Sequence, residues 1–376
     1  MRILHTADWH IGKIVNEVSM LEDQEYFLNQ LIEKLKSLEV DVLIMAGDLY
    51  DRAFPPKEAV ALVNSVLTRL IHEVKIPVFI IAGNHDSNDR VEYGASLFEL
   101  SNLYIEGTVK EETRKVTIQD TNFYLLPFAD HVYIRELLKD DSIKSLEDAT
   151  RAQINKIKET MNKEETNILI AHGFVINISD DSSETTDSER PLSIGTAEYV
   201  NVELFEDFDY VALGHLHKPQ KVKHDRVRYS GSILKYSKSE AIQKKQVSLV
   251  TLEKDKVEIE PIYLKPLHDM RVIKGYFVDL MTQNSDDYVF FELEDEGFVM
   301  DAMNQLRRRF PNAMGLEYAQ KKEDTNIYKK HTQKSLKERP LEELFSDFYK
   351  QFKQKELPAN RKEIVENTLH KIGGQE

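Results

Sequence analysis

The chain has 376 residues, of which 41% are hydrophobic and 31% are charged, and its formal net charge is -15. This length and apolar content predict two or three globular domains and exclude a chain that is disordered throughout. No stretch approaches the roughly 18 consecutive apolar residues of a membrane helix, and the first residues do not read as an export leader. We therefore expect a cytoplasmic protein with no membrane partner.

The charge and the absence of cysteine limit the kinds of site that the chain can build. A net negative charge repels polyanions, so DNA or RNA binding needs basic patches, metal ions or a basic partner. Without cysteine there are no disulfides, thiolate ligands or thiol nucleophile, which fits a reducing compartment. Any metal must be held by Asp, His, Asn or Glu.

The first half of the chain alternates short β-branched runs with amphipathic stretches, as in a sheet covered by helices. Helical spacing of Leu28, Leu31, Ile32 and Leu35 predicts one helix, and residues 59–74 predict another. The acidic, hydroxyl-rich segment 179–190 predicts a mobile loop within this domain. The predicted strands are residues 3–6, 42–46, 78–82, 168–171 and 210–213.

Further strands are predicted at 226–237, 246–253 and 256–264, and we place a domain boundary at residue 268. The next part predicts a small α+β domain, residues 269–320. Its predicted elements are strands at 271–280 and 287–294, a helix at 299–310 and a strand at 314–318. Arg307, Arg308 and Arg309 on this helix either contact DNA phosphates or form a solvated face.

A basic linker follows at 321–339, where seven Lys or Arg residues stand against three acidic ones. Residues 340–376 predict a helical hairpin with Pro358 between its helices. Its two apolar faces comprise Leu341, Leu344, Phe345, Phe348 and Phe352, and Ile364, Val365, Leu369 and Ile372. So short a unit has a small core, so its apolar faces either dock on a partner or pack on the first domain.

Five polar clusters come just after the five strands predicted first. The carboxyl ends of neighbouring strands meet at one edge of an α/β layer, so we expect the clusters to converge in one crevice. The clusters are Asp8 and His10, Asp48, Asn84 with His85 and Asp86, His172, and His215 with His217. A lone histidine after a strand is usually structural, but five clusters at five strand ends indicate a site.

These residue types match a two-metal centre, which needs oxygen ligands and neutral imidazoles. Asp48 is the expected bridging group, because a carboxylate has enough lone-pair directions to hold two cations. Two divalent cations would leave excess positive charge, which suits a phosphate diester, and would activate water near neutral pH. The sequence therefore predicts hydrolysis of phosphate esters.

The motifs DWH, GDLYDR, GNHD, HG and GHLH, in this order, resemble those of the calcineurin-like metallophosphoesterases. More narrowly, HTADWHIGK, AGDLYDRAFP, ALGHLHKPQ and RYSGSILKYS resemble the SbcD-type nuclease subunits of bacterial SbcC-SbcD complexes. This resemblance implies an α/β fold: a β-sandwich flanked by helices, with a small α+β capping domain and a C-terminal helical hairpin. Lys238 departs from the family pattern, in which an aromatic residue is common.

The resemblance implies roles for individual residues. One metal would be held by Asp8, His10 and His217, and the other by Asn84, His172 and His215, with Asp48 bridging. His85 would contact the scissile phosphate or protonate the leaving oxygen rather than bind metal. Chemistry supports this division of roles, because a histidine next to a metal-ligand asparagine can reach the transition state without binding the metal. Asp51 or Asp86 could orient His85 through a carboxylate-to-imidazole hydrogen bond, and a turn role for Asp51 is equally open.

The resemblance also implies two manganese ions, exonuclease and endonuclease action on DNA, and control by an SbcC-type ATPase bound to residues 340–376. It further implies a homodimer within a heterotetramer, acting in DNA repair, recombination and replication. The leading hypothesis is thus a metal-dependent DNA nuclease. The alternatives are a phosphodiesterase or phosphatase for small substrates, and a scaffold that has lost its metals; the intact ligand set argues against the scaffold.

Overall fold

The computed structural model describes residues 1–177, 187, 189, 199–253 and 256–319, together with positions 345, 346, 349, 357, 358, 361, 362 and 365. The chain divides into two compact units, Met1–Tyr318 and Ala319–Glu376. The predicted linker 321–339 lies outside the described residues, as do most of the predicted loop 179–190 and most of the hairpin 340–376. The predicted boundary at 268 falls inside the first unit and stays a prediction.

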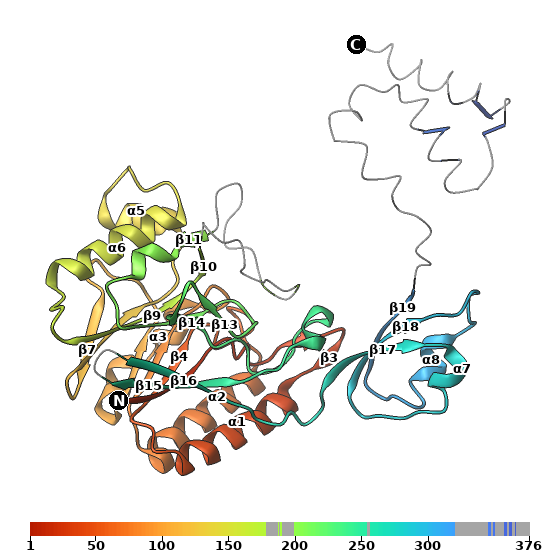
Figure 1. The fold of residues 1–376 in the computed structure, drawn as a ribbon, viewed down its shortest axis with the longest axis horizontal. Helices are drawn as coiled ribbons and strands as arrows, with labels where there is room; N and C mark the ends of the chain where they lie inside the picture. The colour runs from red at the N-terminus through yellow and green to blue at the C-terminus, as the bar shows by residue number, and fades with distance from the viewer. Residues whose placement is uncertain are drawn as a thin grey trace. The chain divides into compact units, whose positions relative to one another are not determined.

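Two six-stranded sheets form the centre of the first unit (Figure 1). In spatial order the first sheet consists of β16 (Lys256–Ile262), β15 (Val247–Glu253), β1 (Arg2–Thr6), β4 (Val42–Ala46), β5 (Val78–Ile81) and β6 (Leu103–Glu106). The second consists of β13 (Gln220–Val222), β14 (His224–Tyr229), β12 (Tyr210–Gly214), β9 (Thr166–His172), β8 (Thr121–Leu126) and β7 (Arg114–Ile118). Side chains of both sheets share one buried apolar cluster, which includes Ile44, Phe79, Phe123 and Ile170. The predicted β-sandwich is therefore confirmed.

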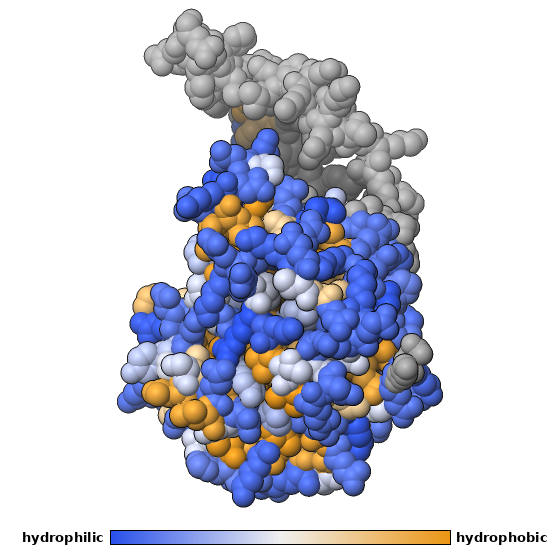
Figure 2. All heavy atoms as spheres, turned by 90° about the vertical axis from the view of Figure 1, so that its left-hand side faces the viewer, coloured by the Kyte–Doolittle hydropathy of each residue, from blue (hydrophilic) through white to orange (hydrophobic). Residues whose placement is uncertain are grey.

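Helices cover the outer faces of the sandwich (Figure 1). α1 (Leu21–Ser37) and α2 (Lys57–Arg69) pack on the first sheet, and α5 (His131–Leu138) and α6 (Leu146–Thr160) pack on the second. The shorter helical turns are η1 (Leu70–Val74), α3 (Asn88–Glu92), α4 (Ala95–Phe98), η2 (Glu99–Ser101), η3 (Val202–Phe205) and η4 (Lys238–Ile242). Among the described residues, no helix combines the length and apolar character needed to cross a bilayer. The face drawn in Figure 2 is mainly hydrophilic, with separate apolar patches.

The core strands of both sheets run parallel, which brings their carboxyl ends to the same edge. β1, β4, β5 and β6 pair in parallel, as do β8, β9, β12 and β14. These central strands are nearly continuous runs of buried residues, as expected for strands covered on both faces. The two-stranded pairs β2 (Ile14–Val15) with β3 (Val18–Ser19), and β10 (Phe174–Ile176) with β11 (Tyr199–Asn201), lie outside the two sheets.

The last part of the first unit is a three-stranded parallel sheet of β17 (Met270–Gly275), β18 (Tyr288–Leu293) and β19 (Ala313–Tyr318), with α7 (Phe277–Leu280) and α8 (Ala302–Leu306). We call residues 269–318 the small domain. It has an apolar cluster of its own around Phe291, Leu306 and Phe310.

Several predicted elements need correction. The strand predicted at 271–280 ends at Gly275, and residues 277–280 form α7. The helix predicted at 299–310 is limited to Ala302–Leu306, because Asp301 has a left-handed φ of 55° and turns follow the helix. Residues 230–237 form no strand, since Gly231 turns the chain with a φ of 79°. Arg307, Arg308 and Arg309 are exposed, and their contact with DNA stays a prediction.

Candidate metal centre

The five predicted polar clusters meet at the carboxyl ends of β1, β4, β5, β9 and β12. Asp8 and His10 follow β1, Asp48 follows β4, and Asn84 follows β5. His172 ends β9, and His215 and His217 follow β12. Six of these seven side chains belong to residues that are at least nine-tenths buried, and Asn84 is partly exposed. The predicted convergence therefore occurs, and it places the residues in two adjoining groups.

The first group contains Asp8, His10 and His217. The Nε2 atoms of His10 and His217 lie 3.0 Å apart, and all three residues offer ligand atoms within 4.8 Å of one another. Asp8 Oδ2 and His10 Nδ1 are buried and have no hydrogen-bond partner among the described residues. Orphaned polar atoms of this kind are costly in a folded protein unless an ion or water satisfies them.

The second group contains Asn84, His172 and His215. Asn84 Oδ1 lies 3.0 Å from His172 Nε2 and 3.2 Å from His215 Nδ1, so the amide oxygen sits between two imidazoles. Asp48 Oδ2 lies 3.5 Å from His172 Nε2 and 3.6 Å from His10 Nε2. A single carboxylate thus faces both groups, which is the position that a bridging ligand requires.

Burial sets the protonation of the imidazoles. It lowers the pKa of His215 to about 3, and it also depresses the pKa values of His10 and His217. Neutral imidazole is the form that binds metal. For His172 burial acts in the same direction, but the neighbouring Asp48 charge outweighs it and raises the pKa to about 9.

The two buried carboxylates differ in the same way. Burial raises the pKa of Asp8 well above its ordinary value. Burial opposes ionisation of Asp48 as well, but the charge and hydrogen bond of His172 outweigh it, and the pKa of Asp48 lies well below its ordinary value. Without a cation, therefore, His172 and Asp48 form a buried ion pair at the centre of the site.

The backbone around the site is held in uncommon conformations. Asp8, His10, Asp48 and His215 have φ values of 52°, 46°, 56° and 112°, a region that non-glycine residues rarely adopt. Such strain persists where the surrounding structure enforces it, and it gathers at functional sites. Close packing adds a second constraint, because a Cβ atom on Gly214 would lie 1.9 Å from the Ala46 carbonyl oxygen.

The residues present fit divalent cations. They supply carboxylate and amide oxygens with imidazole nitrogens, a mixed set that suits first-row divalent ions. A bound cation would satisfy the atoms of Asp8 and His10 that lack a partner among the described residues. It would also account for the short distance between the imidazole nitrogens of His10 and His217. The clusters are therefore compatible with divalent metal binding.

His85 lies beside the first group but is held by a different contact than the carboxylate we expected. Its Nδ1 donates to the main-chain carbonyl oxygen of Asp51 at 2.8 Å. The Asp51 carboxylate turns instead to Lys13 Nζ at 2.8 Å. The Asp86 carboxylate accepts N–H groups of Leu49, Tyr50 and Gly83 and joins the loops after β4 and β5. In the described residues, His85 therefore bonds to the main chain of Asp51 and to neither of these carboxylates.

Three supporting residues were missed in the sequence. Gln24 on α1 donates to the His10 carbonyl oxygen at 2.8 Å and contacts the Tyr236 hydroxyl at 3.0 Å. The Tyr236 hydroxyl donates to the Trp9 carbonyl oxygen at 2.6 Å, and its ring packs edge-on against His10. Glu240 faces His217 Nδ1 at 3.2 Å. Tyr236 lies within the motif RYSGSILKYS and Glu240 lies just after it, but neither residue was assigned a role from the sequence, and Gln24 lies outside the quoted motifs.

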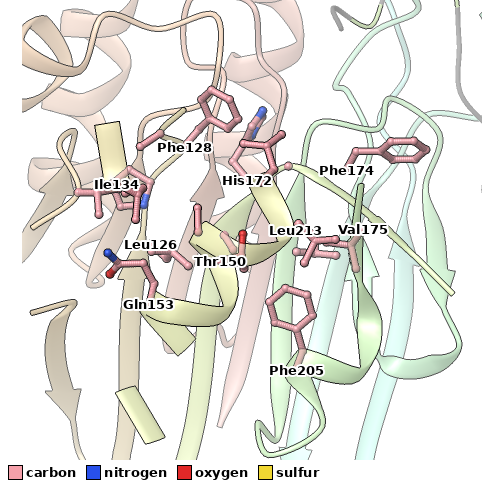
Figure 3. A pocket seen from close by; sticks show the side chains of 18 residues that line it. Leu126, Phe128, Ile134, Thr150, Gln153, His172, Phe174, Val175, Phe205 and Leu213 are labelled. Atoms are coloured by element: carbon pink, nitrogen blue, oxygen red, sulfur yellow. The ribbon is translucent and has the colours of Figure 1, made fainter. Parts of the chain in front are cut away.

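A cavity of about 60 Å³ lies behind His172 (Figure 3). Side chains from β8, β10 and α6 surround it, among them Leu126, Val175 and Thr150. Phe128 and Phe174 lie at its edge near His172. Its lining is mainly apolar, and its volume is well below the roughly 300 to 1,000 Å³ of typical small-molecule pockets.

Comparison with known proteins identifies the class of this chain. The family described as calcineurin-like phosphoesterase matches residues 1–219, and the chain belongs to that family. Residues 266–352 match the SbcD C-terminal family, described as the type 5 capsule protein repressor C-terminal domain. The two matches together support an SbcD-type metallophosphoesterase. A crystal structure of a dimetal phosphatase from Danio rerio matches with 11% identity and a TM-score of 0.43, covering 70% of this chain and 96% of that chain.

Proposed function

We propose that this metal-dependent phosphoesterase is a DNA nuclease that cuts DNA ends and hairpins by exonuclease and endonuclease action in repair and recombination. The observation that carries the chemistry is the position of Asp48, whose Oδ2 faces one imidazole of each ligand group at 3.5 and 3.6 Å. The observation that favours DNA is the match of residues 266–352 to the SbcD C-terminal family.

We assign Asp8, His10 and His217 to one cation and Asn84, His172 and His215 to the other, with Asp48 shared. Manganese suits this mixture of oxygen and imidazole ligands. When bound, two such cations neutralise charge on a phosphodiester and make water nucleophilic near neutral pH. The protein fixes the ligands through the buried ends of five strands.

His85 is the residue that we assign to the substrate. A carbonyl oxygen can only accept, so Nδ1 carries the proton in its bond to Asp51, and Nε2 remains for the phosphate. A protonated Nε2 can donate a hydrogen bond to a phosphate oxygen or a proton to the leaving 3′ or 5′ oxygen. The ring centroids of His85 and His10 lie 4.6 Å apart, so this nitrogen is close to the ligand groups.

The net charge of -15 repels DNA, so we propose that the cations, the basic linker 321–339 and an SbcC-type ATPase provide the attraction. The ATPase would bind residues 340–376, a segment that lies mostly outside the described residues. Within that segment Arg361 donates to the Tyr349 hydroxyl at 3.0 Å. An absence of cysteine and a DNA substrate favour the cytoplasm.

A homodimer needs an apolar surface, and the region of α3 and α4 offers one. Tyr93, Leu97 and Leu100 are 84%, 70% and 89% exposed. Large apolar side chains that gather on one surface mark sites of association. We propose that two copies pair here, so Leu97→Asp should shift the sedimenting species from dimer to monomer, whereas a wild-type monomer would reject this surface.

The second candidate is a phosphodiesterase or phosphatase for small substrates. It would need a pocket that encloses its ligand. In the described residues, the cavity of about 60 Å³ lies behind His172 and touches no other proposed ligand, and the cavity of about 380 Å³ is lined by residues such as Tyr263 and Met270, away from the ligand groups.

Cleavage of a labelled DNA hairpin tests the proposal directly. The purified chain with Mn²⁺ should cut the hairpin, an Asp48→Asn variant should not, and the SbcC-type ATPase with ATP should change the rate or products. Hydrolysis of small phosphodiesters without cleavage of any DNA would reject the nuclease and favour the small-substrate enzyme.

A further inference from the structure

The short helix η4 contacts both the metal centre and the small domain. It spans only Lys238–Ile242, and two of its side chains reach different partners. Glu240 contacts the candidate metal ligand His217, and Lys238 contacts the small domain. Only one residue separates them, so a displacement of one requires a displacement of the other.

Glu240 holds His217 from behind. Its Oε1 lies 3.2 Å from His217 Nδ1, and its side chain is fully buried. Ser237 donates to the same carboxylate at 3.1 Å, and Lys245 forms an ion pair with it. Lys245 also donates to the His217 carbonyl oxygen at 2.8 Å, so the ring and the main chain of His217 are held by one cluster.

This contact sets the chemistry of the His217 ring. Because a carboxylate accepts, Nδ1 carries the proton and Nε2 keeps its lone pair. Nε2 is the atom that lies 3.0 Å from His10 Nε2 in the first ligand group. A carboxylate behind a ligand histidine fixes the ring orientation and raises its basicity.

Lys238 joins η4 to the small domain. Its Nζ lies 2.9 Å from Glu292 Oε1 on β18 and 2.7 Å from Glu317 Oε2 on β19. A single ammonium group thus bridges two neighbouring strands of the small domain.

We propose that Glu240 is a positioning residue for His217, and that Lys238 couples this ligand to the position of the small domain. The inference rests on the proposed role of His217 as a metal ligand. Displacing the small domain pulls on Lys238, shifts η4 and changes the alignment of Nε2 in the first ligand group. Through this route a partner that moves the small domain can alter metal affinity at the first site.

Calorimetric titration of Mn²⁺ into the metal-free full-length protein tests the inference. Removing the group that hydrogen-bonds the far nitrogen of a ligand histidine typically weakens metal binding about 10- to 100-fold. We expect a loss of this size in Mn²⁺ affinity at one of the two sites in Glu240→Ala. Glu240→Gln keeps an acceptor for Nδ1 and should recover part of the affinity. Lys238→Met should weaken the same site about two- to tenfold, in line with the modest strength of partly exposed ion pairs.

Two variants serve as matched controls. Lys274→Met removes an ion pair with Glu294 that lies wholly within the small domain, and Ile242→Ser changes a 92% exposed residue of η4. Neither should change Mn²⁺ affinity. Thermal unfolding of every variant identifies loss of folding, and Lys238→Met keeps the test open if Glu240→Ala does not fold.

The outcomes separate this inference from the proposed function. If the wild type binds no Mn²⁺, the proposed metal centre itself fails. If the wild type binds two ions and folded Glu240→Ala and Lys238→Met bind them equally well, the metal centre stands and the coupling is overturned. Recovery of Glu240→Ala cleavage at high Mn²⁺ would support a positioning role, since excess metal does not repair a misfolded chain.

Discussion

His85 Nδ1 lies 2.8 Å from the main-chain carbonyl oxygen of Asp51, while the Asp51 carboxylate pairs with Lys13 at the same distance. The imidazole is therefore oriented by the backbone of the GDLYDR motif and not by its second aspartate side chain. A side-chain substitution cannot remove a main-chain carbonyl group. We therefore expect substitutions of His85 and of Asp51 to have different effects.

Replacing His85 with Gln or Ala should remove cleavage while leaving metal binding nearly intact. The expected loss of turnover is about 10²- to 10⁴-fold, the usual contribution of a general acid or base. Metal content and Mn²⁺ titration should match the wild type, because His85 is assigned to the phosphate. Loss of both ions in a folded variant would instead make His85 a ligand.

Replacing Asp51 with Asn should be far milder than replacing His85. The carbonyl oxygen that accepts from His85 Nδ1 stays in place. What is lost is the carboxylate charge, which faces Lys13 at 2.8 Å, Arg52 at 3.7 Å and His10 Nδ1 at 3.9 Å. We expect a loss of turnover smaller than that of His85→Ala, because Asn keeps the size of the side chain and the main-chain partner of His85 is unchanged. Activity as low as that of His85→Ala would show that the carboxylate acts in catalysis.

Cation binding should release protons and strengthen as pH rises from 7 to about 9. The pair with Asp48 raises the pKa of His172 to about 9 in the metal-free protein, so the ring is protonated at neutral pH. Its proton must leave before Nε2 can bind a cation, which gives up to about tenfold tighter binding per pH unit below that pKa. Titrations in buffers with different ionisation enthalpies measure the release.

The same titrations on a His172→Gln variant provide the control, because one titrating group is then absent. Binding that is independent of pH between 7 and 9 in the wild type would contradict the protonated state of His172. The direction matters here: a pKa raised above its ordinary value favours the metal-free protein at low pH, so affinity must fall as pH falls.

Removing residues 340–376 should leave Mn²⁺-dependent cleavage of simple DNA unchanged and weaken capture of the SbcC-type ATPase. The predicted metal ligands and His85 all lie within Met1–Tyr318, so the truncation spares them. A pull-down with the purified ATPase checks the loss, and the full-length chain is the comparison. Equal capture by both chains would place the docking surface elsewhere.

Much of the sandwich could be predicted because its central strands are short, apolar and followed by polar residues. The five strands that carry the site form where their hydrophobic pattern indicated, at β1, β4, β5, β9 and β12. The convergence of Asp8, Asp48 and His172 followed from strand polarity alone. The hydrophobic pattern was less informative in the small domain. There Asp301 has a left-handed conformation, so α8 begins after it.

The supporting contacts could not be predicted, because they join residues with no common spacing. Glu240 and His217 are 23 positions apart, and Gln24 and Tyr236 are 212 positions apart. Asp51 shows a further limit: the sequence placed it near His85, but only the structure shows that its carbonyl oxygen makes the contact. Side-chain identity does not reveal which backbone group faces a ligand.

The most direct test of the account is a crystal structure of the protein grown with Mn²⁺, with data collected at a wavelength where manganese scatters anomalously. The account predicts two anomalous peaks roughly 3.5 to 4 Å apart. One should contact Asp8, His10 and His217, the other Asn84, His172 and His215, and Asp48 should contact both. A single peak, or a peak bound by His85, would contradict the two-metal centre.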